Sequence, residues 1–388
     1  MKEKNSIGII IPNDFIKLLP FGGGSGFIHN IIRYIDNPVI IFGAGVNGTP
    51  LWKPQQLNDK TSFISTYPAT YPSSFPLRLC ALQGYLRNRH RILNSGIKLL
   101  YIHSPECALP FLFGKERVHV VFHQHGSGNP VTTAKFIWAR NGLLTWLFDY
   151  IHKIIYRRAD WIIAIDRLCH QQAAFCGAGN KVSLLMNAVD TDKFRPDMVS
   201  RFKMRQKNNL YNDEVAIFYV GRLEEVKQID RLIAGITLLR NSPRVRLFIA
   251  GEGTLRTPLE FFAKRLRIEH SVVFLGKIPH DRLPAYYNMA DILVLPSKME
   301  GVPMVILESL ACGTPVIATK VGGIPDLVFP ITNGLLLDYA TPETISCAIQ
   351  EAAGICWNRN KVSGTVAQLG ADMIAEKLNK LFNQLLNR

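Results

Sequence analysis

The stretch Glu300-Gly301-Val302-Pro303-Met304-Val305-Ile306-Leu307-Glu308 places two carboxylates eight positions apart, with Gly and Pro soon after the first. The largely apolar run 291–296 before it has the length and composition of a buried parallel strand. Pro303 stands where proline is favoured, at the first position of a helix. The sequence therefore predicts a strand, a loop and a helix. Glu300 falls in the loop, and Glu308 falls about one and a half turns into the helix.

This arrangement suits a ligand that carries both phosphate and hydroxyl groups. A helix that starts at the carboxyl end of a strand turns its first amides toward the crevice where open α/β sheets bind ligands. Those amides suit a phosphate, and the carboxylates of Glu300 and Glu308 suit the hydroxyls of a sugar or ribose. Two glutamates at this spacing also occur by chance, so the spacing alone does not decide the function.

Composition describes a folded protein with an anionic partner. The chain has 388 residues, 47% hydrophobic and 19% charged, which is enough for two domains with their own cores. Its 45 Lys and Arg against 30 Asp and Glu give a net charge of +15, which favours nucleic acid, an anionic membrane surface or a phosphorylated substrate. Seven Cys without a C-x-x-C motif predict neither a disulfide framework nor a zinc site. We expect a cytoplasmic protein without a signal peptide or transmembrane helix.

The first half of the chain alternates predicted strands and helices. A strand at 7–11 leads to the loop Gly22–Gly26 and a helix at 27–35, an arrangement that brings backbone amides close to a phosphate. The run 43–48 matches the dinucleotide-binding pattern G-x-G-x-x-G by letter. We interpret it as a turn, because Thr-Pro follows where a helix should begin. Residues 49–75 are expected to form an excursion from the fold.

Two further stretches of the first half each allow two interpretations. His123 and His125 end a predicted strand, where a histidine can bind a ligand or shuttle a proton, although lone histidines are usually structural. The stretch 133–160 interleaves aromatic and cationic side chains. We favour a buried scaffold helix there over a helix at a membrane interface.

The second half repeats the alternation of strands and helices. The run 187–196 has the composition of a linker, and we interpret its Asp190-Thr-Asp192 as turn chemistry rather than a metal-binding pair. Arg222 and Lys227 follow the strand 215–220, so a guanidinium fork and a point charge can both reach one diphosphate. Strands alternating with helices in both halves predict two doubly wound α/β domains.

Together these motifs resemble, in content and order, the retaining glycosyltransferases of family 4, which have the GT-B fold. The resemblance implies two Rossmann-like domains facing across a cleft. Residues 1–187 would form the acceptor-side domain, 188–196 a linker, 197–370 the nucleotide-sugar-binding domain, and 371–388 a helix returning to the first domain. Departures from the family pattern are Ala188, Gln228 and Asp326. The matching pieces are Gly22–Gly26, His125-Gly126, Asn187-Ala-Val-Asp190 with Phe194 and Pro196, Gly221-Arg222 with Lys227, Gly251-Glu-Gly253, Glu300 with Glu308, and Gly322-Gly323-Ile-Pro325.

The resemblance also implies an activity and its residues. The expected enzyme moves a sugar from a nucleotide-diphosphate-sugar donor to a saccharide or lipid-linked saccharide acceptor, in surface polysaccharide or glycolipid assembly. Glu300 and His125 are the expected catalytic residues. Such enzymes usually need no metal, because cationic side chains stabilise the leaving diphosphate, so we expect neither metal nor cofactor. The expected donor-binding residues are Gly23, Gly24, Arg222, Lys227, Gly301, Val302, Pro303, Met304, Val305 and Glu308.

Other functions stay open at this stage. A phosphorylase or a sugar-nucleotide epimerase of the same fold would use a similar donor site. A nucleic-acid-binding protein is suggested only by the basic charge, and the chain lacks a recognition motif, so we expect no nucleic-acid partner. Peripheral association with the cytoplasmic face of an anionic membrane is a further hypothesis, motivated by the net charge and by the stretch 135–158.

Overall fold

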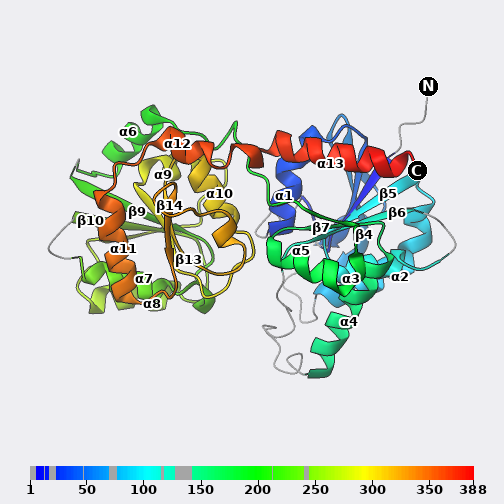
Figure 1. Ribbon diagram of the computed structural model, residues 1–388, viewed down its shortest axis with the longest axis horizontal. Helices are drawn as coiled ribbons and strands as arrows, with labels where there is room; N and C mark the ends of the chain where they lie inside the picture. Colours follow the sequence, from blue (N-terminus) through cyan, green and yellow to red (C-terminus); the bar gives the residue numbers. More distant parts are fainter. Residues whose placement is uncertain are drawn as a thin grey trace. The chain divides into compact units, whose positions relative to one another are not determined.

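A computed structural model describes residues 6–12, 14–16, 23–46, 48–69, 77–114, 118–126, 142–211, 213–239 and 244–388. The chain divides into two compact units (Figure 1). Unit 1 comprises Met1–Asn187 and Ala371–Arg388, and unit 2 comprises Ala188–Gly370. Each unit is built on a largely parallel sheet flanked by helices, so the prediction of two Rossmann-like α/β domains is confirmed. None of the helices in the described part of the chain combines the length and apolarity needed to span a bilayer.

The order in which the chain adds strands to the sheet of unit 1 reverses between two central strands. Its order is β3-β4-β2-β1-β5-β6-β7-β8, and only the β3–β4 pair is antiparallel. The chain moves outward from β1 on one side and later from β5 on the other, so a topological switch point lies between β1 and β5. The strands are β1 Ser6–Ile10, β2 Val39–Val46, β3 Pro54–Asn58, β4 Thr61–Ala69, β5 Ile97–Ile102, β6 His119–Gln124, β7 Trp161–Ala164 and β8 Val182–Leu184.

The carboxyl-terminal helix completes unit 1, as the resemblance implied. Asn379 on this helix accepts a hydrogen bond from the Asp36 amide at 3.2 Å and donates one to the Tyr34 carbonyl at 2.9 Å. The helical segments of the unit are α1 Gly23–Ile31, η1 Ile32–Tyr34, α2 Leu77–Leu93, α3 Pro105–Ala108, η2 Leu109–Phe111, α4 Gly142–Arg158, α5 Arg167–Ala173, the π-helical turn η4 Ala174–Ala178, and α13 Ala371–Leu386.

The structure corrects three predictions near the amino terminus. Gly23 and Gly24 are the first residues of α1 and not part of a loop, while Gly22 lies outside the described residues. The predicted turn at 43–48 is wrong in its first part, because β2 continues through Gly45 to Val46 beside β4. A Cβ on Gly45 would lie 3.1 Å from the Ser65 Cβ, so glycine serves close packing there. The described part of 49–75 is no excursion, since it forms β3 and β4.

Helix α4 corrects the interpretation of 133–160, of which residues 133–141 lie outside the described residues. Only His152, Ile155 and Tyr156 of α4 are buried. In Figure 1 the amino-terminal half of this helix extends away from the sheet of unit 1, so it has no sheet face to cover. The interpretation as a buried scaffold helix is therefore wrong for that half. The large apolar side chains exposed on it are Leu143, Trp146, Leu147 and Tyr150.

Unit 2 contains a wholly parallel six-stranded sheet in the order β11-β10-β9-β12-β13-β14. Its switch point lies between β9 and β12, the strands that precede Arg222 and Glu300. The topology therefore places both candidate segments at the ligand-binding crevice of an open sheet. The strands are β9 Glu214–Val220, β10 Arg244–Ala250, β11 Val272–Gly276, β12 Ile292–Leu295, β13 Val316–Thr319 and β14 Gly334–Leu337.

The chain enters unit 2 through a compact turn. The Lys193 amide donates to Asp190 Oδ1 at 3.2 Å and the Phe194 amide donates to the Asp190 carbonyl at 2.8 Å, so this aspartate serves turn chemistry as predicted. The helical segments of the unit are α6 Met198–Lys207, η5 Glu225–Lys227, α7 Ile229–Thr237, α8 Arg256–Arg265, α9 Leu283–Met289, α10 Met304–Ala311, η6 Ile324–Asp326, α11 Pro342–Gly354, α12 Arg359–Gly364 and η7 Ala367–Leu369.

Candidate active site

An ion pair joins the two loops at the switch point of unit 2. Lys227 Nζ donates to Glu300 Oε1 at 2.6 Å, and the two side chains are only 16% and 11% exposed. Ser297 Oγ donates to the same carboxylate oxygen at 2.6 Å, and the Lys298 amide donates to the Val226 carbonyl at 2.8 Å. The structure thus brings together two predicted site residues that are far apart in the sequence. Ser297, which the sequence analysis missed, fixes the orientation of the carboxylate.

Glycines allow the loops around this ion pair to touch through their backbones. Gly322 has φ 56°, and a Cβ on it would lie 2.0 Å from the Glu300 carbonyl oxygen. The next amide, of Gly323, donates to the Gly301 carbonyl at 2.8 Å. A Cβ on Gly251 would lie 1.8 Å from the carbonyl oxygen of Gly221. These motif glycines therefore support the loops that carry Arg222 and Glu300.

Arg222 lies on the same loop as Lys227 but points into solvent. Its side chain is 60% exposed, and its NH1 group donates to Glu224 Oε1 at 2.8 Å. An exposed ion pair contributes only about 0–1 kcal/mol, so an incoming anion can displace Glu224 at little cost. Within the described chain, the structure pairs Arg222 with this neighbour and not with Glu300 or Glu308.

The amino terminus of α10 stands directly after the Glu300 loop. Pro303 is the N-cap, with φ −72° and ψ 124°, and Met304 is the first helical residue. The expectation that Pro303 occupies the first helical position is wrong by one residue, because its ψ angle is extended. No side chain caps this helix and its first turn has no acidic residue, so the amides of Met304 and Val305 suit an anion. Val302 is buried and Gly301 lacks a side chain, so both can offer only backbone groups.

Glu308 is held by two donors that the sequence did not reveal. It is 3% exposed, with Tyr287 Oη donating to Oε2 at 2.8 Å and His280 Nε2 lying 2.8 Å from Oε1. Burial, and then the neighbouring Glu308, raise the pKa of Tyr287 well above its usual value, so the phenol stays protonated. His280 is 43% exposed, and its other nitrogen lies 3.1 Å from Lys193 Nζ. A ligand hydroxyl would reach Glu308 by displacing His280 and not Tyr287.

In unit 1 the structure brings His125 and Gly24 together. A Cβ on Gly24 would lie 3.4 Å from His125 Nε2, so the bare backbone at the start of α1 can approach the imidazole. His125 Nε2 also lies 2.6 Å from Nδ1 of His103, which follows β5 and which the sequence analysis missed. Burial lowers the pKa of His125 to about 4, so its ring is neutral at physiological pH.

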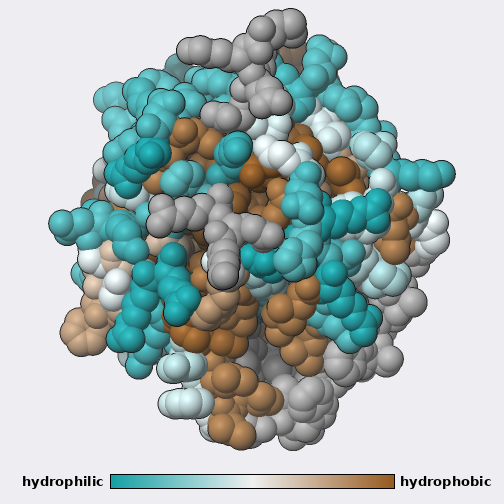
Figure 2. All heavy atoms as spheres, turned by 90° about the vertical axis from the view of Figure 1, so that its right-hand side faces the viewer, coloured by the Kyte–Doolittle hydropathy of each residue, from teal (hydrophilic) through white to brown (hydrophobic). Residues whose placement is uncertain are grey.

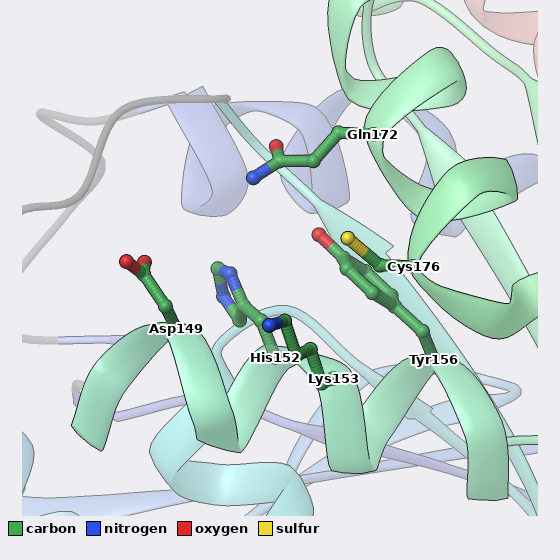
Figure 3. A pocket seen from close by; sticks show the side chains of 6 residues that line it. All are labelled: Asp149, His152, Lys153, Tyr156, Gln172 and Cys176. Carbon is green, nitrogen blue, oxygen red and sulfur yellow. The ribbon is translucent and has the colours of Figure 1, made fainter. Parts of the chain in front are cut away.

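A small pocket opens beside α4 in the same unit (Figure 3). Its volume of about 230 Å³ is below the ~300–1,000 Å³ of typical small-molecule sites, so it does not suit a whole nucleotide sugar. Tyr156 donates to Gln124 Oε1 at 2.8 Å, and the Gln124 amide group lies 3.3 Å from Gln172. The pocket-lining side chains that Figure 3 labels are Asp149, His152, Lys153, Tyr156, Gln172 and Cys176.

Comparison with known proteins decides the family. A model described as glycosyl transferases group 1 matches residues 200–353, and a model described as glycosyltransferase family 4 matches residues 21–193. The chain belongs to the glycosyltransferases that these two models describe, group 1 and family 4. The resemblance inferred from the motifs is thereby confirmed, and the matched ranges cover large parts of both units of this family member.

A curated relative agrees with the assignment, and solved structures share the fold. This glycosyltransferase-family chain is 32% identical over 200 residues to a GDP-mannose-dependent α-(1-6)-phosphatidylinositol monomannoside mannosyltransferase of Mycolicibacterium smegmatis, covering 49% of this chain and 52% of that protein. The chain spans about half the length of the curated relatives it matches. Sucrose-phosphate synthase from Thermosynechococcus elongatus has a similar structure, with a TM-score of 0.84, 22% identity and 99% of each chain covered. Anabaena HepE in complex with UDP-glucose has a TM-score of 0.70, 17% identity, and 98% of this chain and 99% of its own covered.

The close approach at Gly322 predicts that Gly322→Ala displaces the Glu300 loop. The added Cβ would meet the Glu300 carbonyl oxygen at 2.0 Å from a backbone with φ 56°. We expect a loss of more than about 1 kcal/mol in unfolding free energy, measured by chemical denaturation. The matched control is Gly364→Ala, where nothing lies within 4 Å of the added Cβ, and which should not destabilise the protein. Equal stability of the two variants would contradict this account of the loop.

Burial of His152 predicts a loss of stability in acid. Burial lowers the pKa of this ring from 6.5 to about 4, so between these values the unfolded chain binds a proton that the folded chain does not. The stabilisation present above pH 6.5 is therefore lost as the pH falls toward 4, with a slope of up to about 1.4 kcal/mol per pH unit. Denaturation between pH 4 and 7 should show a flatter curve for His152→Phe than for the wild type. Parallel curves would disprove this role for His152.

Proposed function

We propose that this chain is a retaining glycosyltransferase that moves a sugar from a nucleotide-diphosphate-sugar donor to a saccharide or lipid-linked saccharide acceptor. The observation that carries the proposal is the Lys227–Glu300 ion pair, at the switch point of unit 2 and directly before the uncapped helix α10. Family membership supports it. So do the GDP-mannose dependence named for one similar protein and the UDP-glucose bound in the structure of another. The lipid acceptor named for the first of these motivates a role in glycolipid or surface polysaccharide assembly.

The cationic loop after β9 would hold the donor diphosphate. Lys227 is neutralised by Glu300, and a diphosphate would take over that neutralising role. Arg222 would leave Glu224 and add a bidentate contact. The amides of Met304 and Val305 would complete the anion site. Charge that develops on the leaving diphosphate would then be stabilised by groups already in place, and this step needs no metal.

The carboxylates of unit 2 would contact the sugar parts of the donor. Glu300, released from Lys227 but still bonded to Ser297, would accept hydrogen bonds from the transferred sugar near its anomeric carbon. Glu308 would bind the ribose hydroxyls once His280 has moved away. His125 is a neutral imidazole, which can donate a hydrogen bond from one ring nitrogen and accept one at the other.

Two other enzymes of this fold class could use the same donor site. A sugar-nucleotide epimerase would convert the donor without an acceptor, and a phosphorylase would require inorganic phosphate. Product analysis with and without acceptor separates both from a transferase. The basic charge alone does not favour a nucleic-acid-binding protein.

The donor proposal predicts a thermal shift that depends on Arg222. A donor sugar nucleotide at 100 times its Kd should stabilise the folded chain by about 2.7 kcal/mol, so a screen of nucleotide sugars should find at least one that raises Tm. Arg222→Ala should abolish that shift without lowering Tm in the absence of ligand, because this side chain is exposed.

Arg244→Ala is the matched control. Arg244 is also exposed and forms an ion pair with Asp213 at 3.8 Å. It stands at the first position of β10, which is parallel to β9, so it lies at the opposite ends of these strands from the loop that carries Arg222. This variant should keep the full donor-induced shift. Loss of the shift in both variants, or in neither, would count against the assignment of Arg222.

The exposed face of α4 supports peripheral association with an anionic membrane. Trp146 and Tyr150 stack with ring centroids 5.4 Å apart, and Leu143 and Leu147 are exposed with them. Basic residues end the same helix, and the whole chain carries a net charge of +15. Figure 2 views the molecule from the right-hand side of Figure 1. It shows hydrophobic side chains gathered at the lower end of that side, at the level of α4. Exposed aromatic and apolar side chains beside cations suit a lipid interface.

Vesicle flotation tests this association. The wild type should float with vesicles containing anionic lipid and much less with neutral vesicles, and the double variant Trp146→Ser/Leu147→Ser should lose most of that binding. The control is Phe261→Ser/Tyr339→Ser, which removes two exposed aromatic side chains from unit 2 and should bind as the wild type does. No flotation of the wild type would remove the membrane proposal and leave the transferase proposal standing.

A further inference from the structure

A polar pocket of unit 1 lies between helix α4 and the segment formed by α5 and η4. From these two sides His152, Tyr156 and Gln172 point toward one another (Figure 3). The volume of the pocket is about 230 Å³. A cavity of about 150 Å³ holds one benzene ring, so this pocket has room for one six-membered ring with hydroxyl substituents. We call it the α4–α5 pocket.

The α4–α5 pocket offers both hydrogen-bond donors and acceptors. Tyr156 donates its hydroxyl proton to Gln124 Oε1 at 2.8 Å, so the Tyr156 oxygen can still accept a hydrogen bond from a ligand. Gln172 Oε1 accepts from Gln124 Nε2 at 3.3 Å, which leaves the Gln172 NH₂ group to donate to a ligand. The pocket is also lined by one carboxylate and one ammonium group, those of Asp149 and Lys153. Such a mixture suits an uncharged ring with several hydroxyl groups better than it suits an anion.

Exposed apolar side chains border the α4–α5 pocket on both of its sides. On α4, the exposed Trp146 precedes the pocket residue Asp149 by three positions, and side chains at this spacing are neighbours on a helix. On the other side, Leu168 is exposed four positions before Gln172, and Phe175, three positions after it, is 93% exposed. A polar pocket with an apolar rim suits a ligand that joins a hydroxyl-rich head to a hydrocarbon chain.

A buried glutamine connects the pocket to the loop that carries His125. Gln124 is the last residue of β6 and is 2% exposed. Its Nε2 group lies 3.1 Å from the Gly126 carbonyl, to which it donates, and the same side chain contacts Tyr156 and Gln172. A ring in the α4–α5 pocket would therefore lie beside the loop of an expected catalytic residue.

We propose that the α4–α5 pocket binds one sugar ring of a lipid-linked acceptor, and that the apolar rim contacts the hydrocarbon part of the same molecule. The assignment of this ring to the acceptor rests on the proposed function. Gln172 then recognises ring hydroxyls, and Phe175 contacts hydrocarbon. A free saccharide offers the same ring without the hydrocarbon, so the test uses both forms.

Saturation-transfer NMR with the full chain tests recognition of the ring. The probes are the methyl and octyl glycosides of glucose, galactose, mannose and N-acetylglucosamine, with the octyl forms kept below their micelle concentration. For at least one sugar the ring protons should receive saturation from the protein. Gln172→Trp should fill the pocket and remove that signal, whereas the neighbouring exposed position offers a matched control, Gln171→Trp, which should retain it. Absence of a signal from every octyl glycoside, or equal signals in the two variants, would overturn the proposal.

Gln172→Leu provides a milder variant in case the tryptophan variant does not fold. It keeps most of the side-chain volume and removes the amide group. Loss of one hydrogen bond should weaken binding of the ring by about 2- to 10-fold. Unchanged affinity in this variant would contradict the role of Gln172.

A comparison of the two probe forms tests the apolar rim. The octyl glycoside should bind the wild type more tightly than the methyl glycoside of the same sugar. Phe175→Ser should reduce that difference, and Phe261→Ser, which removes an exposed phenylalanine from unit 2, should leave it unchanged. Equal affinities of the wild type for the two forms would overturn the lipid part of the proposal.

The donor-induced thermal shift separates failure of this proposal from failure of the proposed function. Gln172→Leu should keep that shift, because Gln172 belongs to unit 1 and the expected diphosphate ligands Arg222 and Lys227 belong to unit 2. A chain that responds to a nucleotide sugar but binds no glycoside would contradict the pocket assignment alone. A chain that binds a glycoside in the pocket but responds to no nucleotide sugar would support the ring site and contradict the transferase proposal.

Discussion

The Lys227–Glu300 ion pair is the interaction on which the candidate donor site depends. Both side chains are mostly buried, and removing one partner of a buried pair leaves a charge whose desolvation costs on the order of 3–5 kcal/mol. The pair therefore keeps the two loops at the switch point in a fixed arrangement before any ligand arrives. A diphosphate can replace the carboxylate as the partner of Lys227, so donor binding exchanges one ionic contact for another. Glu300 remains oriented by Ser297 through this exchange and becomes available to the sugar.

Sheet topology explains why residues far apart in the sequence meet at these sites. Parallel strands end at one edge of a sheet, and the loops beside a switch point separate to leave a crevice. The sequence predicted the central strands, because β9, β10 and β12 are largely apolar runs with glycine or proline after them. It also predicted the segments with Arg222, Lys227 and Glu300, since charged residues directly after such strands are unusual for a buried core. It missed β3, β8 and β14, because a polar edge strand and very short strands give no clear hydrophobic period. It also missed β4, which lies in the stretch 49–75 that was interpreted as an excursion because of its Pro, Tyr, Thr and Ser content.

Tertiary contacts decided what the sequence could not show. Nothing in the spacing of Glu308 indicates that Tyr287 and His280 occupy both of its oxygens. The proximity of His103 and His123 was invisible for the same reason, because the two residues are 20 positions apart in the sequence. The β5–β6 register, which pairs Ile102 with Phe122, makes them neighbours. Gln228 is a departure from the family pattern, in which glycine is common at this position. It adopts φ 50°. A left-handed non-glycine residue costs roughly 1–2 kcal/mol, so the family glycine has a backbone reason.

A crystal structure of the full chain with a bound nucleoside diphosphate sugar tests the central claim most directly. The account predicts diphosphate oxygens within hydrogen-bond distance of Lys227 Nζ and of the first amides of α10, with Glu300 turned to the sugar. It would be contradicted by a nucleotide bound elsewhere while Lys227 and Glu300 keep their 2.6 Å contact.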